Sequence, residues 1–243
     1  MLKGKTALIT GGSRGLGQAI VESYISNGCR VAFTWESSIA EAENLTHRFG
    51  DAAVSFQADA LDFVRTTQVV EDTIKTLGHI DILVCNVGGS KDRPIWEIDY
   101  DGFDYSVRMT LYSCFNYVRA VAEHMKSRCQ GSIISIGSIN GLRGREGNVG
   151  YCAGKAALIG FIKTVAKELG EFSINANIVA PGYIDVESQR KTSELIKQLI
   201  LDECAIRRLS KPSEVADVVC FLGSDLARNI TGQTIVVDCG QSL

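Results

Sequence analysis

The chain has 243 residues, of which 45% are hydrophobic and 22% are charged, with a formal net charge of −3. This composition is typical of a soluble globular protein; it gives no electrostatic case for binding nucleic acid or an anionic membrane, and no apolar run reaches the ~18 residues of a membrane span. The first residues, MLKGKTALIT, enter a strand-like run at once and leave no room for a signal peptide, so we expect a cytoplasmic protein.

Short apolar runs alternate along the chain with longer helical patterns. The runs expected to be strands are 5–10, 30–35, 53–59, 80–88, 131–138, 174–182 and 233–238. Helices are expected at about 15–27, 40–49, 63–77, 100–128, 151–169, 188–203 and 213–222. Apolar strands alternating with helices predict a parallel sheet covered on both faces. We therefore expect one domain over residues 1–243, an α/β doubly wound (Rossmann) fold with seven parallel strands and helices on both faces.

Residues that commonly bind metal ions are dispersed along the chain. The eight cysteines lack CxxC spacing and mostly lie in apolar stretches, as buried reduced thiols do. The three histidines, His47, His79 and His124, have no acidic or thiol companions at ligand spacing. We expect no metal site, and any acid–base chemistry must use other side chains.

The turn after the first expected strand is rich in glycine. In ITGGSRGLGQAI, Gly11, Gly15 and Gly17 allow a tight turn and a close backbone approach to a ligand. The next helix would present free N–H groups and its positive dipole end to a pyrophosphate. The spacing G-x-x-x-G-x-G differs from the G-x-G-x-x-G fingerprint, and such a turn can simply close a loop. Its place between the first strand and the first helix favours nucleotide binding.

The pentapeptide YCAGK places Tyr151 four residues before Lys155. On a helix these side chains share a face, so the phenol and the ammonium group can approach one point. A nearby cation favours the phenolate and lowers a pKa that is ordinarily about 10. The pair is either an acid–base device or a chance pair on a helix surface.

These motifs, in this order, resemble the classical short-chain dehydrogenase/reductase family over essentially the whole chain. The resemblance rests on Thr10–Gly17, Asp59, Asn86–Gly88 (NVG), Ser138, YCAGK and Pro181–Gly182. It implies a nicotinamide-dependent enzyme that reduces carbonyls or oxidises secondary alcohols. The segments GFIKTVAKELG, INANIVAPGYI and RRLSKPSEVADVVCFLGSD are most similar to bacterial 3-oxoacyl-[acyl-carrier-protein] reductases.

The resemblance assigns the catalytic roles. Tyr151 is the expected general acid in the reducing direction, and Lys155 is expected to hold the nicotinamide ribose and lower the pKa of the phenol. Ser138 would hydrogen-bond the substrate carbonyl and stabilise its developing charge. Thr110 stands where the family usually has an asparagine that holds a relay water. A hydroxyl offers fewer groups than an amide, so either a rearranged water chain keeps the enzyme active, which we favour, or the relay is broken.

The residues expected at the cofactor lie in the glycine turn and at the exits of later strands. They are Gly11, Ser13, Arg14, Gly15, Leu16, Gly17, Trp35, Asp59, Ala60, Asn86, Gly88, Tyr151, Lys155, Pro181, Gly182 and Ile184. Val186 replaces the threonine that usually reaches the nicotinamide carboxamide. Arg14 resembles the basic residue that binds the 2′-phosphate of NADPH, whereas Glu36 lies near the place of an acidic residue that selects NAD. NADP(H) is favoured, and NAD(H) is the alternative.

The expected function is NADPH-dependent reduction of a ketone to a secondary alcohol, with a 3-oxoacyl thioester or a related β-keto compound as substrate. The alternatives are a dehydrogenase of a secondary alcohol, sugar or polyol in specialised metabolism, and a catalytically silent dinucleotide-binding regulator. Residues 183–207 would form a flap over the substrate, with Asn140 and Tyr183 as candidate contacts. An acidic carrier protein could bring the substrate, although Phe172 replaces one basic residue used in such docking beside Lys126 and Arg128. The resemblance also implies a homodimer or homotetramer.

Overall fold

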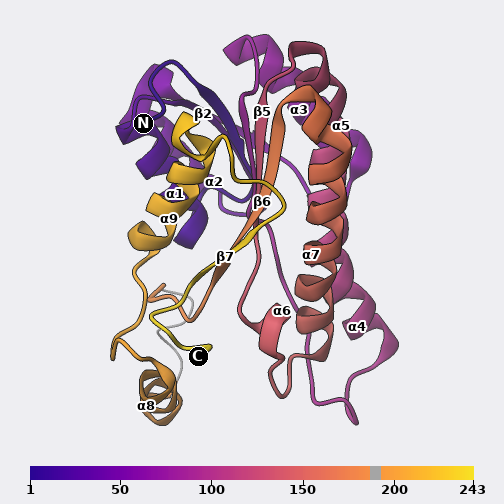
Figure 1. Ribbon diagram of the computed structural model, residues 1–243, viewed down its shortest axis with the longest axis vertical. Coiled ribbons are helices and arrows are strands. Elements are labelled where there is room, and N and C mark those ends of the chain that lie inside the picture. The colour runs from indigo at the N-terminus through magenta and orange to yellow at the C-terminus, as the bar shows by residue number, and fades with distance from the viewer. Residues whose placement is uncertain (187–192) are drawn as a thin grey trace.

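The structure, a computed structural model, describes residues 1–186 and 193–243, and its centre is a sheet of seven parallel strands in the order β3–β2–β1–β4–β5–β6–β7. Helices cover both faces of this sheet, as the alternating pattern predicts (Figure 1). The strand order reverses between β1 and β4, which is the place where doubly wound sheets bind ligands. The predicted α/β doubly wound fold is confirmed.

Each expected strand is present, β2 with the expected bounds and the others with tighter ones. The strands are β1 (Thr6–Ile9), β2 (Arg30–Trp35), β3 (Ala53–Gln57), β4 (Ile82–Cys85), β5 (Gly131–Ile136), β6 (Ile174–Pro181) and β7 (Thr234–Val237). The α-helices of the described residues are α1 (Gly15–Ser26), α2 (Ile39–Phe49), α3 (Phe63–Leu77), α4 (Tyr100–Val107), α5 (Ser113–Arg128), α6 (Asn140–Arg143), α7 (Val149–Leu169), α8 (Glu194–Glu203) and α9 (Pro212–Gly223). Single 3₁₀ turns are η1 (Gly50–Ala52), η3 (Gly170–Phe172) and η5 (Asp225–Ala227). Residues 188–192 of the helix expected at 188–203 lie outside the described residues.

Two apolar clusters fill the space between the sheet and its helices. Figure 1 shows α1, α2 and α9 on one side of the sheet and α3, α5 and α7 on the other. Successive strand residues point to opposite faces, so Leu8 joins the cluster beneath α3, α5 and α7 while Ile9 joins the cluster beneath α1 and α9. The register pairs Leu8 with Leu83 and Ile9 with Val84, which brings the ends of β1 and β4 to one edge.

The region expected to be helical from 100 to 128 is continuous but contains a π turn. α4 runs into this turn, η2 (Arg108–Tyr112), which leads directly into α5. π turns inside helices are frequent at functional sites. Thr110, the residue in place of the usual asparagine, lies within it.

One described segment, Val149–Phe172, is long and apolar enough to cross a membrane by length and composition alone, with a mean hydropathy of 1.3. It consists of α7 and the 3₁₀ turn η3. α7 packs against β6 and α4, and its Lys155 side chain is buried inside the protein. A helix that covers a sheet needs such an apolar side, so the fold accounts for this composition.

At the opposite end of the strands, His124 of α5 forms a hydrogen bond with the backbone just before β4. Its Nε2 accepts the backbone N–H of Ile80 at 3.1 Å, which requires an unprotonated nitrogen. Burial, followed by the charges of Arg128 and His79, lowers the pKa of His124 from its usual 6.5, while Asp81 acts in the opposite direction. The neutral form is therefore the one that the folded protein stabilises.

We expect this hydrogen bond to stabilise the fold above about pH 6.5, by about 1 kcal/mol at most. This contribution should be lost as the pH falls through the lowered pKa of His124 in the folded protein. The unfolded chain takes up the proton first, so acid favours unfolding. His124→Gln supplies an acceptor oxygen that does not titrate and should flatten this part of the pH dependence. Urea unfolding at about pH 7.5 and about pH 5.5 measures the difference, and identical pH dependence in both proteins would contradict the assignment.

Candidate active site

The glycine turn joins β1 to α1 at the strand-exit edge. Gly11 and Gly15 have φ angles of 63° and 58°, in the left-handed region that side chains disfavour. A Cβ on Gly17 would lie 2.0 Å from the carbonyl oxygen of Gly11, so this position admits no side chain. α1 begins after Arg14, whose side chain makes no capping hydrogen bond. Among the described residues its first N–H groups are left as donors that a phosphate could use.

Hydrogen bonds from β2 and β4 brace this turn. The Asn86 amide donates to the carbonyl oxygens of Thr10 and Gly11, each at 3.1 Å. The Thr10 hydroxyl accepts the N–H groups of Asn86 at 2.9 Å and Val87 at 3.2 Å, and Thr34 Oγ1 accepts the Gly11 N–H at 3.1 Å. The sequence analysis named Asn86 as a cofactor residue but did not find the bracing role of the two threonines.

Residues at the exits of β2 and β3 flank the turn. Trp35 ends β2, and its indole Nε1 is buried without a hydrogen-bond partner among the described residues. Arg14 and Glu36, the two residues that bear on the choice of nicotinamide, are both exposed. Ser13 is buried, and its hydroxyl is 2.6 Å from that of Ser38.

Asp59 and Ala60 follow β3 on the same edge. The Asp59 carboxylate accepts the N–H of Leu61 at 2.8 Å, so it shapes its own loop. Ala60 is buried, and its carbonyl oxygen accepts the Asn116 amide of α5 at 2.9 Å. These contacts place the loop beside the nucleotide turn without filling the space above it.

Ser138, Tyr151 and Lys155 meet at the exit of β5. Tyr151 and Lys155 lie on one face of α7, as their spacing predicts, and the Ser138 hydroxyl lies close enough to the phenol to act on its pKa. Lys155 is 4% exposed, and its Nζ lies 5.5 Å from the centre of the Tyr151 ring. The ammonium group donates to the carbonyl oxygen of Ile136 at 2.6 Å and lies beside Gly88, where a Cβ would be 3.6 Å away.

The electrostatics differ from the expectation for a phenol beside a cation. Burial raises the pKa of Tyr151, and the nearby Ser138 hydroxyl acts in the opposite direction without reversing the shift. Burial also lowers the pKa of Lys155 to about 8, because a low dielectric disfavours the charged ammonium. The expected net lowering of the phenol's pKa is therefore wrong, because burial is the largest influence and raises it. A phenol that keeps its proton at neutral pH suits a proton donor.

Thr110 packs directly behind this pair. Its side chain is 1% exposed, and Oγ1 has no hydrogen-bond partner among the described residues. A Cβ on Gly154 would lie 2.8 Å from the Cβ of Thr110, so the glycine of YCAGK is what lets the π turn approach α7. The structure therefore places Thr110 beside the catalytic helix.

The segment after β6 closes the other side of the site. Pro181 ends β6, and a Cβ on Gly182 would lie 2.6 Å from the Cβ of Asp238, which leaves room only for glycine. The side chain of Val186 lies 3.9 Å from the Cβ position of Gly15, so this segment meets the glycine turn. An apolar contact thus stands where the family usually has a threonine.

The two candidate substrate residues lie on either side of Ser138. Asn140 begins α6; its N–H donates to Ser138 Oγ at 3.1 Å, and its buried Oδ1 has no hydrogen-bond partner among the described residues. The Tyr183 N–H donates to Gln241 Oε1 at 3.0 Å, and Ile184 is buried. Of the expected flap, residues 187–192 lie outside the described residues. No cluster of His, Cys, Asp or Glu suited to a metal occurs within the described ranges.

Asp92 is the site residue that the sequence analysis missed. Its two carboxylate oxygens accept the backbone N–H groups of Gly150 at 2.9 Å and Tyr151 at 3.0 Å, so it caps the first turn of α7. A Cβ on Gly150 would lie 2.9 Å from Asp92 Oδ1 and 2.8 Å from the Cβ of Ser106, so glycine is needed for this approach. No sequence pattern connects residues 58 positions apart.

We expect Asp92→Ala to lower kcat/KM by roughly tenfold to a hundredfold, because Tyr151 loses the bonds that fix its position. Asp92→Asn keeps one acceptor and should recover much of the loss. Burial is the main reason that the pKa of Tyr151 is raised, and the Asp92 carboxylate adds to it. Asp92→Asn should therefore move the alkaline limb of the pH–rate profile for reduction to lower pH.

Asp99→Ala is the matched control for this experiment. Asp99 caps α4 by accepting the Gly102 N–H at 2.7 Å, so its loss should cost similar stability without touching Tyr151. Equal losses of kcat/KM in Asp92→Ala and Asp99→Ala, with no movement of the pH profile in Asp92→Asn, would show that Asp92 acts only on stability.

Comparisons with known proteins agree with this geometry. A family model described as enoyl-(acyl carrier protein) reductase matches residues 11–242. The chain is 37% identical over 239 residues to the 3-oxoacyl-[acyl-carrier-protein] reductase FabG of Salmonella typhimurium, covering 98% of this chain and 97% of that protein. It is 35% identical over 243 residues to nodulation protein G of Azospirillum brasilense, covering 97% of each. A solved mutant of a Serratia marcescens short-chain dehydrogenase/reductase superposes with a TM-score of 0.93 at 35% identity, covering 100% of this chain and 99% of that one.

Proposed function

The chain belongs to the short-chain dehydrogenase/reductase family and is an NAD(P)-dependent oxidoreductase, and we propose that it reduces a ketone to a secondary alcohol. The proposed substrate is a 3-oxoacyl thioester or a related β-keto compound. The observation that carries the proposal is that the Tyr151 phenol, with the Ser138 hydroxyl close by, lies beside the buried Lys155 ammonium, whose Nζ is 5.5 Å from the centre of the phenol ring. A regulator that only binds nucleotide has no need of this arrangement.

The pair suits the charge that forms when a ketone is reduced. Addition of hydride to the keto carbon places negative charge on the attached oxygen, which needs donors and one proton. Because the Ser138 hydroxyl lies close to the Tyr151 phenol, both hydroxyls can reach a single substrate oxygen. The raised pKa keeps the phenol protonated, so Tyr151 can donate that proton. Lys155, whose pKa is about 8, can exchange a proton near neutral pH. It can therefore help to return a proton to Tyr151 after the phenol has donated its own.

The glycine turn and the strand exits fit a nicotinamide dinucleotide. The uncapped N–H groups of α1 would hold its pyrophosphate, and the missing side chain at Gly17 allows the close approach. Trp35 at the end of β2 would lie near the adenosine ribose, and Lys155 beside Gly88 would face the nicotinamide ribose. When bound, this cofactor supplies the hydride.

The printed descriptions of relatives name two reactions on carrier-bound acyl groups. The family model names an enoyl reductase, whereas the Salmonella relative is a 3-oxoacyl reductase. The chain is 37% identical to that Salmonella relative over 98% of its own length, so we infer the 3-oxoacyl reaction. Reversal of the same chemistry on a secondary alcohol, sugar or polyol remains the second candidate, because the donors fit either direction.

Lys126 and Arg128, the two cations expected to bind an acidic carrier protein, give this docking limited support because both make contacts within the chain. Arg128 pairs with the buried Asp81 carboxylate at 3.0 Å, and Lys126 lies 5.1 Å from the centre of the Phe172 ring. Both side chains stand at the end of α5 that faces away from Ser138 and Tyr151. A small thioester is therefore the first substrate to try, with the carrier-bound form as the next.

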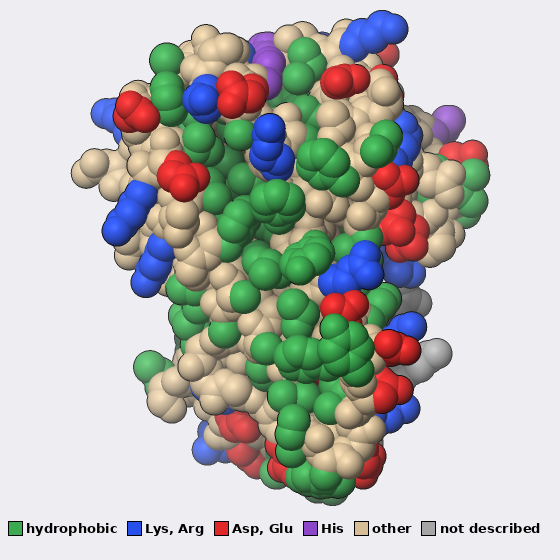
Figure 2. All heavy atoms as spheres, turned by 90° about the vertical axis from the view of Figure 1, so that its right-hand side faces the viewer, with side chains coloured by type: hydrophobic (Ala, Val, Ile, Leu, Met, Phe, Trp, Pro, Cys, Tyr) green, Lys and Arg blue, Asp and Glu red, His purple; other side chains and the backbone are tan. Residues whose placement is uncertain are grey.

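The face formed by α5 and α7 supports assembly into a homodimer or homotetramer. Figure 2 shows hydrophobic side chains gathered on the side of the molecule that carries these helices. Phe115 and Tyr112 are 45% and 52% exposed, and Phe115 packs edge-on against Phe161 at 6.3 Å. Such a patch is typical of a protein–protein contact. The number of subunits, the cytoplasmic location and the relay role of Thr110 stay predictions.

Tyr151→Phe tests the proposed function. Removing the phenol hydroxyl should lower kcat for an acetoacetyl thioester by roughly 10²–10⁴-fold while cofactor binding changes little, because only the proton donor is lost. Initial rates of NADPH oxidation and fluorescence titration of NADPH measure the two effects. Nucleotide binding without turnover in wild type, on thioesters, ketones and polyols alike, would instead favour the silent regulator.

Arg14→Ala and Glu36→Ala test the preference for NADP(H), which we infer from Arg14. If Arg14 pairs with the 2′-phosphate, its removal should raise KM for NADPH by roughly tenfold and leave KM for NADH nearly unchanged. Glu36→Ala should improve NADPH binding modestly by removing a like charge. The reverse pattern, with Glu36→Ala harming NADH and Arg14→Ala harming neither, would assign the enzyme to NAD(H).

A further inference from the structure

Three segments that lie far apart in the sequence meet beside the last residues of the chain. Figure 1 shows the C-terminus between α8 and α6, and Gln241 in this part of the chain is 3% exposed. An amide removed from water in this way needs hydrogen-bond partners inside the protein. The partners of Gln241 come from the backbone after β6, from α8 and from α6.

The side-chain amide of Gln241 joins the chain just after β6 to the end of α8. Its Oε1 accepts the backbone N–H of Tyr183 at 3.0 Å, and its Nε2 donates to Glu203 Oε2 at 3.0 Å. Tyr183 stands two residues after Pro181, the last residue of β6, and Glu203 is the last residue of α8. One buried side chain therefore holds the chain at both of these places.

Arg143 closes the network. Its Nη1 donates to the backbone carbonyl oxygen of Gln241 at 2.9 Å, and its Nη2 donates to Glu203 Oε2 at 2.9 Å. The hydrogen bonds from Gln241 and Arg143 lower the pKa of the Glu203 carboxyl. A lone exposed ion pair contributes little to stability, but here each residue contacts the other two. A planar guanidinium held at two acceptors fixes direction as well as distance.

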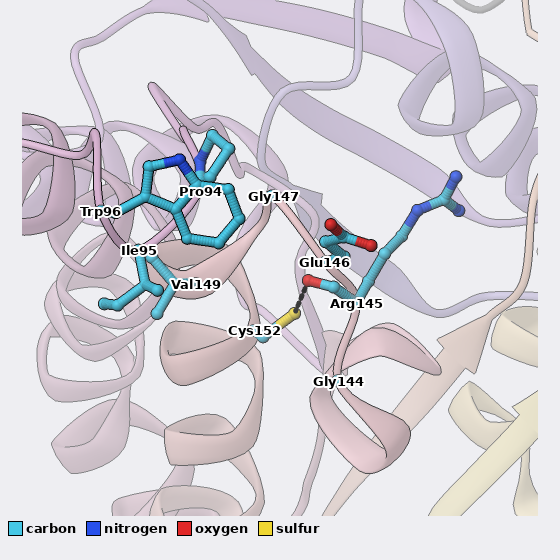
Figure 3. A pocket seen from close by; sticks show the side chains of 9 residues that line it. All are labelled: Pro94, Ile95, Trp96, Gly144, Arg145, Glu146, Gly147, Val149 and Cys152. Atoms are coloured by element: carbon cyan, nitrogen blue, oxygen red, sulfur yellow. Dashed lines mark hydrogen bonds between the residues drawn. The ribbon is translucent and has the colours of Figure 1, made fainter.

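The network acts on the ketone side of the reaction centre through α6. Arg143 is the last residue of this short helix, which begins at Asn140, and the Asn140 N–H donates to Ser138 Oγ at 3.1 Å. Figure 3 shows the loop after α6 meeting the first turn of α7, where the Cys152 thiol donates to the carbonyl oxygen of Arg145 at 3.9 Å. α6 is therefore held from two sides, by this turn and by the network.

The network acts on the cofactor side through the backbone after β6. Tyr183 lies between Gly182 and Ile184, two of the residues expected at the cofactor. A Cβ on Gly182 would lie 2.8 Å from Gln241 Oε1, so the backbone here packs directly against the amide. The position of Gln241 therefore decides the position of this segment.

The segment 238–243 that carries Gln241 is itself held by several bonds. The Asp238 carboxylate accepts the N–H groups of Gly240 and Ser242, each at 2.8 Å, and the Ser242 hydroxyl at 2.6 Å. The Ile206 N–H donates to the carbonyl oxygen of Cys239 at 2.9 Å. Gln241 thus extends from a fixed support, as a side chain that positions other groups must.

We propose that Gln241, with Glu203 and Arg143, is a positioning residue for hydride transfer. Through these side chains the backbone at Tyr183, on the cofactor side, is held at a fixed distance from Ser138, on the ketone side. This inference rests on the proposed function and adds positioning residues to it. A misplacement of about 1 Å caused by a remote change can cost about a hundredfold in rate, so none of the three needs to touch the reacting atoms.

Gln241→Ala tests this role. In the ligand-free protein, the Tyr183 amide should exchange its hydrogen with solvent roughly tenfold faster, because its acceptor is gone. kcat/KM for an acetoacetyl thioester should fall by roughly tenfold to a hundredfold. With NADPH deuterated at the transferred position, the isotope effect on kcat/KM should exceed that of wild type, because hydride transfer becomes slower relative to the other steps. Hydrogen-exchange mass spectrometry and initial rates measure these effects.

Two substitutions of Glu203 separate geometry from charge. Glu203→Gln keeps an oxygen that can accept from Gln241 and Arg143, so it should retain most of kcat/KM. Glu203→Leu keeps no acceptor and should resemble Gln241→Ala in rate and isotope effect. In the double variant of Glu203→Leu and Gln241→Ala the loss should be about that of either alone, because the two residues act as one unit.

Asn177→Ala is the matched control. Asn177 is a fully buried amide of β6; its Nδ2 donates to the carbonyl oxygen of Ile230 at 2.7 Å, and its Oδ1 accepts the Gln233 N–H at 3.0 Å. Its loss should cost similar stability and leave the isotope effect and the exchange at Tyr183 as in wild type.

Three results would overturn the positioning role while ketone reduction stands. They are unchanged exchange at Tyr183 in Gln241→Ala, faster exchange with the kcat/KM and isotope effect of wild type, and equal changes in Asn177→Ala. A wild type that binds NADPH but reduces no ketone would instead contradict the proposed function, and this role in hydride transfer with it.

Discussion

The rest of the site depends on the close packing of α7 against α4 and the π turn. Gly150 and Gly154 face Ser106 and Thr110, and a Cβ on either glycine would lie 2.8 Å from the side chain opposite. Overpacking such a contact forces the backbone apart. The contact therefore fixes both the distance and the rotation of α7, and this rotation directs Tyr151 and Lys155 toward the strand exits.

Parallel pairing places every other part of the machinery at this same edge. The glycine turn after β1, Asn86 after β4, Ser138 after β5 and Pro181 at the end of β6 meet there because the strands share one direction. Burial then sets the chemistry: it keeps the phenol protonated and makes the ammonium group easier to deprotonate. A low dielectric also strengthens each interaction with developing charge. Fold and reactivity thus have a common physical origin.

At the two positions that depart from the family pattern, the side chains make an apolar contact or fit tightly against a neighbouring residue. Thr110 fits against Gly154, and Val186 approaches Gly15. Thr110 does not separate Tyr151 from Lys155, and Val186 does not separate the glycine turn from the strand exits. The geometry around the proton donor is therefore compatible with activity in spite of both substitutions.

The doubly wound fold, the glycine turn, and the shared face of Tyr151 and Lys155 could be predicted from the sequence, because these follow from local periodicity and from spacings within one element. The sequence could not reveal Asp92 or the contacts of Gln241, since those depend on where separate segments come to rest. It also gave the wrong net direction for the pKa of Tyr151. The sequence shows which charge is near, but only the packed structure shows how much water is excluded, and here burial is the largest influence on that pKa.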